Sequence, residues 1–259
     1  MSRGDLTDAE WRILNPLLPD RGERGPAVAD RRRTINGILW VLRTGAPWRD
    51  MPERYGNWNS VFVRFSRWSK LGVWDAAFET LASLGPPADE EHAIDSTIVR
   101  AHQHAAGVKG GIKNKKRSAA RAAASRPKST SARNANGEPL TFDGTGGEAH
   151  EVKGYEALIE LHDVAPDRLL GDKGYDSDAI RHDLRDSGAT PEIPTKSNRR
   201  VQYSVSKPLY ALRSRIECFI GHLKEQRRVA TRYDKLATSF VGFVLLGCIR
   251  IWARFVHRA

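Results

Sequence analysis

Apolar residues recur at helical spacing through the first third of the chain, across residues 5–84. Thr7, followed three residues later by Glu10, matches a capping box that starts a helix. Residues 31–43 and 58–71 repeat the helical pattern, and Gly/Pro turns separate the segments. The pattern therefore predicts a small all-helical N-terminal domain. The apolar residues at helical spacing after the capping box are Trp11, Leu14, Leu17 and Leu18, and the positions predicted to face inward in the second helix are Ile35, Ile38, Leu39 and Leu42.

After Gly85-Pro86-Pro87 the pattern changes to short apolar runs alternating with helical stretches, which favours an α/β fold. We therefore predict a boundary between a helical domain at 1–87 and a second domain at 88–259. Phe240 to Cys248 is apolar but too short to span a bilayer, so we expect a buried C-terminal helix. The predicted strands are 92–99, 139–142, 168–172 and 190–194, and the predicted helices are 151–162, 177–186 and 208–228.

Residues 109–133 stand apart from both patterns. They are rich in lysine and arginine, lack acidic residues and have no large apolar residue after Ile112. Such a composition is typical of a disordered or weakly helical segment.

The charge balance favours nucleic acid as the partner. Lysine and arginine number 42 against 31 acidic residues, which gives a formal charge of +11 and a pI near 9.9. Electrostatic attraction to phosphate makes nucleic acid the expected ligand, and the alternative is a basic protein whose charge serves only its solubility. The only two cysteines, Cys218 and Cys248, have no zinc-ligand spacing, and the N-terminus has no signal-peptide core, so we expect a cytoplasmic protein without a membrane partner.

The helical segment 58–71 mixes aromatic residues with Arg64 and Arg67. One interpretation is a helix-turn-helix-like DNA-binding unit in which these arginines contact DNA. The other is an ordinary helical subdomain with buried tryptophans, and the sequence favours neither.

Two aspartates lie where an α/β fold collects functional groups. Asp95 interrupts an apolar strand, where an ionised carboxylate is costly unless a positive charge compensates it. Asp172 ends the strand Arg168–Asp172 and opens a glycine-containing turn. Taken singly, each could instead be a hydrogen-bonded or capping residue.

A polar stripe marks the predicted helix at 208–228. Tyr210, Arg213, Glu217 and Lys224 fall within roughly 60° of one another at 100° per residue. The alternative is an exposed Arg213–Glu217 ion pair, which does not explain the tyrosine and the lysine. The neighbouring apolar stripe, predicted to face the core, is Leu209, Leu212, Ile216, Phe219, Ile220 and Leu223.

The carboxylates Asp95, Asp172 and Glu217 suit two-metal phosphoryl transfer. Mg²⁺ prefers oxygen ligands and leaves coordination positions for substrate phosphate. Two ions, with Mn²⁺ as a possible substitute, would activate the attacking oxygen and stabilise the leaving one. Arg213 and Lys224 would then hold the DNA backbone.

At these residues the chain resembles the DDE transposases of bacterial insertion sequences, in the family-five group of the family-four superfamily. The resemblance implies an RNase-H-like mixed sheet flanked by helices, catalytic and metal-binding roles for Asp95, Asp172 and Glu217, and DNA positioning by Tyr210. It also implies Mg²⁺ dependence, homo-oligomers on nucleoid DNA, cleavage at element ends and strand transfer. The motifs that carry it are Ala93-Ile94-Asp95-Ser96-Thr97, Gly171-Asp172-Lys173-Gly174-Tyr175-Asp176, the spacing Tyr210-x2-Arg213-x3-Glu217-x6-Lys224, Leu6 to Trp11, Gly45 to Arg49 and Tyr55 to Trp58.

Residues 115–132 depart from the family pattern, which has a Gly/Arg-rich turn and a strand there. We hypothesise a local reading-frame shift that removes this strand from the sheet, which would leave a distorted or inactive copy. Two alternative functions follow: a catalytically dead copy that only binds DNA, and an RNase-H-like nuclease without strand transfer.

Overall fold

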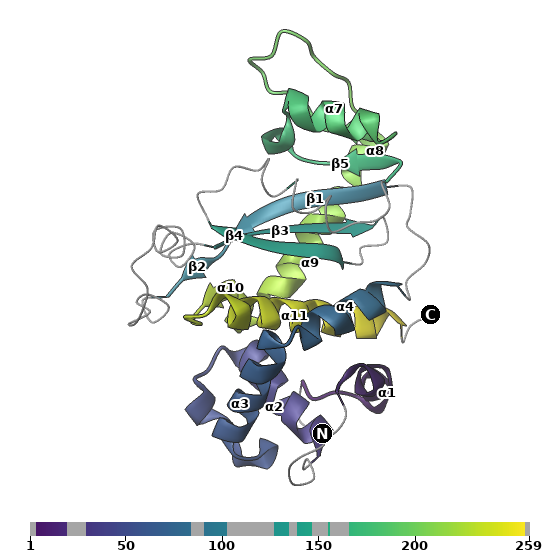
Figure 1. Ribbon diagram of the computed structural model, residues 1–259. Coiled ribbons are helices and arrows are strands. Elements are labelled where there is room, and N and C mark those ends of the chain that lie inside the picture. Colours follow the sequence, from purple (N-terminus) through teal and green to yellow (C-terminus); the bar gives the residue numbers. More distant parts are fainter. Residues whose placement is uncertain are drawn as a thin grey trace. The chain divides into compact units, whose positions relative to one another are not determined.

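The computed structural model describes residues 4–19, 30–83, 91–102, 127–134, 139–146, 155 and 166–256 (Figure 1). The chain divides into two compact units. The first comprises residues 1–84, 101–108 and 223–259, and the second comprises 85–100 and 109–222. The C-terminal residues thus group with the N-terminal helices by their contacts.

The predicted N-terminal helices of the first unit are confirmed, with the local signals that the sequence indicated. Thr7 caps the first helix. Its hydroxyl accepts a hydrogen bond from the Glu10 N–H, and the Glu10 carboxylate accepts one from the Thr7 N–H. Gly45 ends the second helix at φ 69°, a left-handed conformation that favours glycine. The elements are α1 (Asp8–Leu14), η1 (Asn15–Leu17), α2 (Arg31–Thr44), η2 (Trp48–Asp50), η3 (Glu53–Tyr55), α3 (Trp58–Lys70) and α4 (Val73–Ser83).

The apolar C-terminal segment forms the buried helix α11 (Ala237–Val256), as predicted. The rings of Phe65 on α3 and Phe243 on α11 stack with centroids 4.2 Å apart. Gly242 permits this close approach, because an added Cβ would lie 2.5 Å from the Ser69 hydroxyl. The first unit also contains α10 (Arg227–Ala230) and β7 (Thr231–Arg232), which pairs with β2 (Arg100–Ala101). Among the described residues, no helix has the length and apolarity needed to cross a membrane.

The second unit is built on a mixed five-stranded sheet in the order β4-β3-β1-β5-β6 (Figure 1). The strands β1, β3 and β4 pair antiparallel, whereas β1, β5 and β6 pair parallel. A mixed helix-rich α/β architecture is therefore confirmed. The strands are β1 (Glu91–Ile98), β3 (Pro127–Asn134), β4 (Pro139–Gly146), β5 (Arg168–Leu170) and β6 (Thr190–Glu192).

Strand β3 corrects two sequence-based expectations. The predicted disordered or weakly helical segment at 109–133 contains most of this strand, and the hypothesis of a missing strand within 115–132 is wrong for residues 127–132. The strand pairs with β1 from His92↔Asn134 to Ile98↔Lys128. Its other edge pairs with β4. Hydrogen bonding to a strand on each side therefore stabilises β3 although its residues have a low intrinsic β-propensity. The rest of the segment lies outside the described residues.

The predicted helix at 208–228 is also corrected, because three shorter helices cover it: α8 (Lys207–Ala211), α9 (Ser214–Lys224) and α10. Between the first two, the N–H groups of Arg213 and Arg215 bond to carbonyls three residues back, which tightens the turn and ends regular α-helix. The helix predicted at 177–186 is α7 (Asp178–Asp186), and η5 (Lys173–Tyr175) precedes it. The helix predicted at 151–162 lies outside the described residues except for Tyr155.

Candidate active site

Asp95 lies on β1, and Asp172 lies two residues beyond the end of the neighbouring parallel strand β5, which is shorter than the predicted strand 168–172. In the β1–β5 ladder Ala93 is opposite Leu170. Asp95 follows Ala93 by two positions, and Asp172 follows Leu170 by two positions. The Gly171 N–H still bonds to the Glu192 carbonyl of β6, so the strand direction continues up to the second aspartate. Because neighbouring strands lie about 4.8 Å apart, this register brings both backbone positions close together.

Alternation along the strands places both carboxylates on one face of the sheet. Ile94 and Leu169 point to the opposite face, where they join a buried cluster that includes Ile180 and Leu184 of α7. Asp95 and Asp172 are therefore directed away from that cluster, and both are only partly exposed. The sheet face opposite the cluster containing α7 is the candidate active face.

The turn that carries Asp172 is fixed by its own backbone. Asp172 is extended at φ −79° and ψ 176°, and its Oδ1 accepts a 2.8 Å hydrogen bond from the Gly174 N–H. At Gly171, an added Cβ would lie 3.4 Å from both Ile193 and Tyr175. The capping role that the sequence left open for Asp172 is therefore present, and it holds the carboxylate in a defined orientation.

Glu217 lies near the start of α9, and its side chain is 52 % exposed. Its Oε1 accepts a short hydrogen bond from Arg213, whose guanidinium stands 5.6 Å from the centroid of the Tyr210 ring. Tyr210, Arg213 and Glu217 thus form a linked series, although they do not share one regular helix. Lys224 is the last residue of α9, and the buried residues of this helix are Ile216, Phe219, Ile220 and Leu223.

The oxygen chemistry of the carboxylates fits a hard divalent cation such as Mg²⁺. Asp95 would supply oxygens from β1, and Asp172 from the turn that follows the adjacent strand β5. Glu217 is engaged by Arg213, so it would have to exchange that partner to become a ligand. Within the part of the chain that the structure describes, no three His, Cys, Asp or Glu side chains already form a group that could hold an ion.

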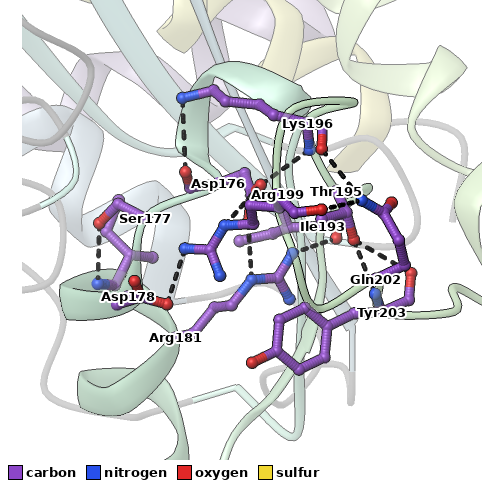
Figure 2. A network of polar contacts seen from close by, with 11 residues as sticks. Asp176, Ser177, Asp178, Arg181, Ile193, Thr195, Lys196, Arg199, Gln202 and Tyr203 are labelled. Atoms are coloured by element: carbon purple, nitrogen blue, oxygen red, sulfur yellow. Dashed lines mark hydrogen bonds and ion pairs between the residues drawn. The ribbon is translucent and has the colours of Figure 1, made fainter.

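Asp176 is a buried anion that sequence reasoning passed over, although it closes the motif Gly171 to Asp176. Its side chain is 0 % exposed and accepts hydrogen bonds from the Arg181 guanidinium and the Lys196 N–H, both 2.8 Å long (Figure 2). Burial raises its pKa, but these hydrogen bonds and the charges of Arg181 and Arg199 outweigh burial, and the net pKa lies below its usual range. The signal available in sequence was an aspartate in the same short motif as Asp172.

The two arginines proposed for the helical domain differ in environment. Arg67 is exposed on α3, whereas Arg64 is half-buried and lies 5.7 Å from the Trp68 ring centroid. Burial, followed by the nearby charge of Arg67, lowers the pKa of Arg64. Both are on the same helix, and Phe62 and Val63 of that helix are exposed.

Two family models match the chain. Residues 86–252, well over half of it, match the family described as the transposase DDE domain. Residues 6–78 match a family of candidate transposases of the IS4/5 group.

The individual relatives include proteins of insertion elements and a protein of Sinorhizobium fredii. The chain is 46 % identical over 107 residues to protein y4sN of Sinorhizobium fredii, covering 40 % of this chain and 82 % of that protein. It is 35 % identical over 112 residues to a 16.2 kDa protein of insertion element IS402 from Burkholderia cepacia, covering 39 % and 76 %. It is 38 % identical over 87 residues to a candidate transposase for insertion sequence element IS6501 from Brucella ovis, covering 33 % and 67 %.

A solved structure shares the fold. The piggyBac transposase in a synaptic complex with hairpin DNA aligns with a TM-score of 0.51 at 10 % identity. The alignment covers 96 % of this chain and 71 % of that chain. At this identity the match concerns the fold alone.

Proposed function

The chain belongs to the DDE transposases of bacterial insertion sequences, and we propose that it cuts DNA at element ends and joins the freed strands to target DNA through Asp95, Asp172 and Glu217. The observation that carries this assignment is the register of β1 against β5, from which Asp95 on β1 and Asp172, two residues beyond β5, follow at equivalent positions. Two carboxylates fixed by a sheet and a third from a helix match the needs of two-metal phosphodiester chemistry.

We propose that the mixed sheet is RNase-H-like. Its antiparallel β1, β3 and β4 beside the parallel β5 and β6 support this, as does β3 in the place where the family has a strand. The intact sheet also favours an active copy over a catalytically dead one.

In the proposed mechanism the protein fixes oxygen ligands and DNA in one arrangement. Asp172 is oriented by its hydrogen bond from the Gly174 N–H, and Asp95 by its place within a paired strand. Bound Mg²⁺, or Mn²⁺, would activate the attacking oxygen and stabilise the leaving oxygen. Glu217 would hold the metal as a third ligand once Arg213 leaves its carboxylate.

Arg213 has a second role in this proposal. Once released from Glu217, its guanidinium can pair with a DNA phosphate, as can the ammonium of Lys224. Tyr210, beside Arg213, supplies a ring and a hydroxyl that help to position the DNA. The exchange of Arg213 between carboxylate and phosphate would couple DNA binding to completion of the ligand set.

We further propose that the N-terminal helical part, residues 1–87, binds DNA through Arg64 and Arg67 of α3. Exposed Arg67 supports this directly. Because Arg64 is half-buried, it would attract the DNA phosphates through its charge and would not form two hydrogen bonds to one phosphate. Homo-oligomers on double-stranded DNA in the nucleoid remain a prediction from the family.

The test uses a plasmid that carries the element with its flanking DNA. Glu217→Gln and Asp172→Asn should abolish Mg²⁺-dependent nicking while gel-shift binding persists. The matched controls are Glu225→Gln, an exposed residue just beyond α9, and Asp167→Asn, beside the opposite end of β5; both should nick like wild type. Full nicking by Glu217→Gln would overturn the assignment.

The same preparation separates the alternative functions. Binding without nicking by well-folded wild-type protein would indicate a DNA-binding protein alone. Nicking without joining of 3′-OH element ends to a target plasmid would indicate a nuclease.

A further inference from the structure

Residues 195–203 form a closed loop after β6. Thr195 and Tyr203 hold its two ends together: the Thr195 hydroxyl donates to the Tyr203 carbonyl at 3.2 Å, and the Tyr203 N–H donates back at 2.8 Å. Inside the loop, the Arg199 N–H bonds to the Lys196 carbonyl, and the Gln202 amide bonds to the Arg199 carbonyl. The loop conformation is thus set before any ligand binds.

Asp176 anchors this loop to the turn that carries Asp172. Its Oδ2 accepts from the Lys196 N–H and lies 3.1 Å from Nε of Arg199, while Oδ1 binds Arg181 (Figure 2). The second guanidinium edge of Arg199 pairs with Asp178 at 2.7 Å. Asp176 follows Asp172 by four positions, so the loop is anchored at the end of the turn that Asp172 begins.

Cationic side chains outnumber carboxylates around this anchor. Arg181, Arg185 and Arg199 all approach the Tyr203 ring, with guanidinium-to-centroid distances of 4.4, 5.3 and 5.9 Å. Asp176 and Asp178 offset only part of this charge. The loop itself contains Lys196, Arg199 and Arg200 and no acidic residue, so its own charge is positive.

Arg200 follows the turn at Ser197 and Asn198 and is exposed, as is Val201 at 59 %. Arg199 is already engaged by two carboxylates, whereas no described carboxylate forms an ion pair with Arg200. The loop uses Arg199 for its anchor and presents Arg200 to solvent. A hydrogen-bonded loop with an exposed arginine is suited to binding an anion at a fixed position.

We infer that residues 195–203 are a preformed contact for the DNA phosphate backbone, made by Arg200, while the ammonium of Lys196 donates to the Asp176 carbonyl at 3.4 Å and helps to hold the loop (Figure 2). Asp176 and Arg199 are the positioning residues that hold the loop to the end of the turn that begins at Asp172. This rests on the proposed function, because that function places DNA at the Asp172 turn. The contact is sequence-independent, since phosphates carry no base information.

The first experiment measures the affinity of the full chain for duplex DNA against salt concentration, in EDTA so that cleavage plays no part. Arg200→Gln should weaken binding several-fold and reduce the slope of log K against log salt by about one, the value for one lost phosphate contact. The control Arg168→Gln, at the start of β5 and so at the end away from Asp172, should bind like wild type. A wild-type affinity and slope for Arg200→Gln would overturn the inference.

The second experiment separates positioning from net charge. Asp176→Asn removes a negative charge, so charge alone predicts tighter DNA binding, whereas loss of the anchor predicts weaker binding. Asp178→Asn makes the same comparison at a carboxylate that is 87 % exposed, so it decides the outcome if the buried variant does not fold. Weaker binding with an unchanged melting temperature for Asp178→Asn supports positioning, and equal or tighter binding overturns it.

The two proposals fail separately. Nicking by Asp172→Asn would overturn the catalytic assignment and leave the salt slope of Arg200→Gln untouched. An unchanged slope for Arg200→Gln would remove the loop contact and leave the carboxylates as assigned.

Discussion

Arg228 and Asp234 form a buried two-point ion pair in the first unit. Nε and one terminal nitrogen of the guanidinium lie 3.0 and 2.8 Å from the two carboxylate oxygens. The same guanidinium lies 5.4 Å from the ring centroids of Tyr233 and Phe243. The pair ties the segment before α11 to the aromatic core of this unit.

Truncating one partner of this pair should be costly. We expect Asp234→Ala to lower the free energy of unfolding by about 3–5 kcal/mol, because it leaves the Arg228 guanidinium buried without its counter-ion. Denaturant unfolding measures the change. Asp8→Ala is the control: it breaks the Arg32–Asp8 pair, whose carboxylate is 69 % exposed, and should cost no more than about 1 kcal/mol. A loss as small as the control's would contradict the structural role of the buried pair.

The two cysteines should differ sharply in reactivity. Burial raises the pKa of the Cys248 thiol to about 12, so little thiolate exists at neutral pH, whereas Cys218 is exposed. A thiol reagent at pH 7.5 should therefore modify one cysteine in native protein, and Cys218→Ser should abolish that fast reaction. Denaturant should restore reactivity in this variant as α11 unpacks. Fast labelling of native Cys218→Ser would contradict burial of the C-terminal helix.

Asp176 should make the protein sensitive to acid. Its folded pKa is lowered from an ordinary 3.8, so the stabilisation is fully present above about pH 4 and is lost as pH falls through the folded pKa. Unfolding free energies measured between pH 6 and pH 2.5 should therefore fall more steeply for wild type than for Asp176→Asn. Parallel pH profiles would show that Asp176 is not a source of the acid sensitivity.

Removing Arg213 should make Glu217 more available to a cation. The competing Arg213–Glu217 interaction is of a kind worth about 0.3–0.5 kcal/mol, so we expect Arg213→Gln to tighten Mn²⁺ binding by about twofold. Calorimetric titration of the DNA-free protein measures this. The matched control is Arg215→Gln, which removes the same charge on α9. Weaker Mn²⁺ binding than in that control would contradict exchange of Arg213 at Glu217.

The sequence predicted individual elements well where the pattern and the local signals agreed. The capping box at Thr7 and the apolar spacing of α2 gave those helices, and a fully apolar run gave α11. The same reasoning missed β3, because Pro127–Asn134 has no apolar alternation of its own. Its place in the sheet comes from pairing with β1 and β4, which are distant in sequence.

For the candidate site, the sequence determined the identity of the residues, because the spacing of Tyr210, Arg213, Glu217 and Lys224 and the motif around Asp172 are properties of the chain itself. Only the tertiary structure decided which of them are neighbours. The register of β1 against β5 brings Asp95 level with Asp172, and the loop after β6 meets Asp176. The physical reason is that strand register and buried ion pairs are set by the burial and hydrogen bonding of the whole sheet, which no local spacing encodes.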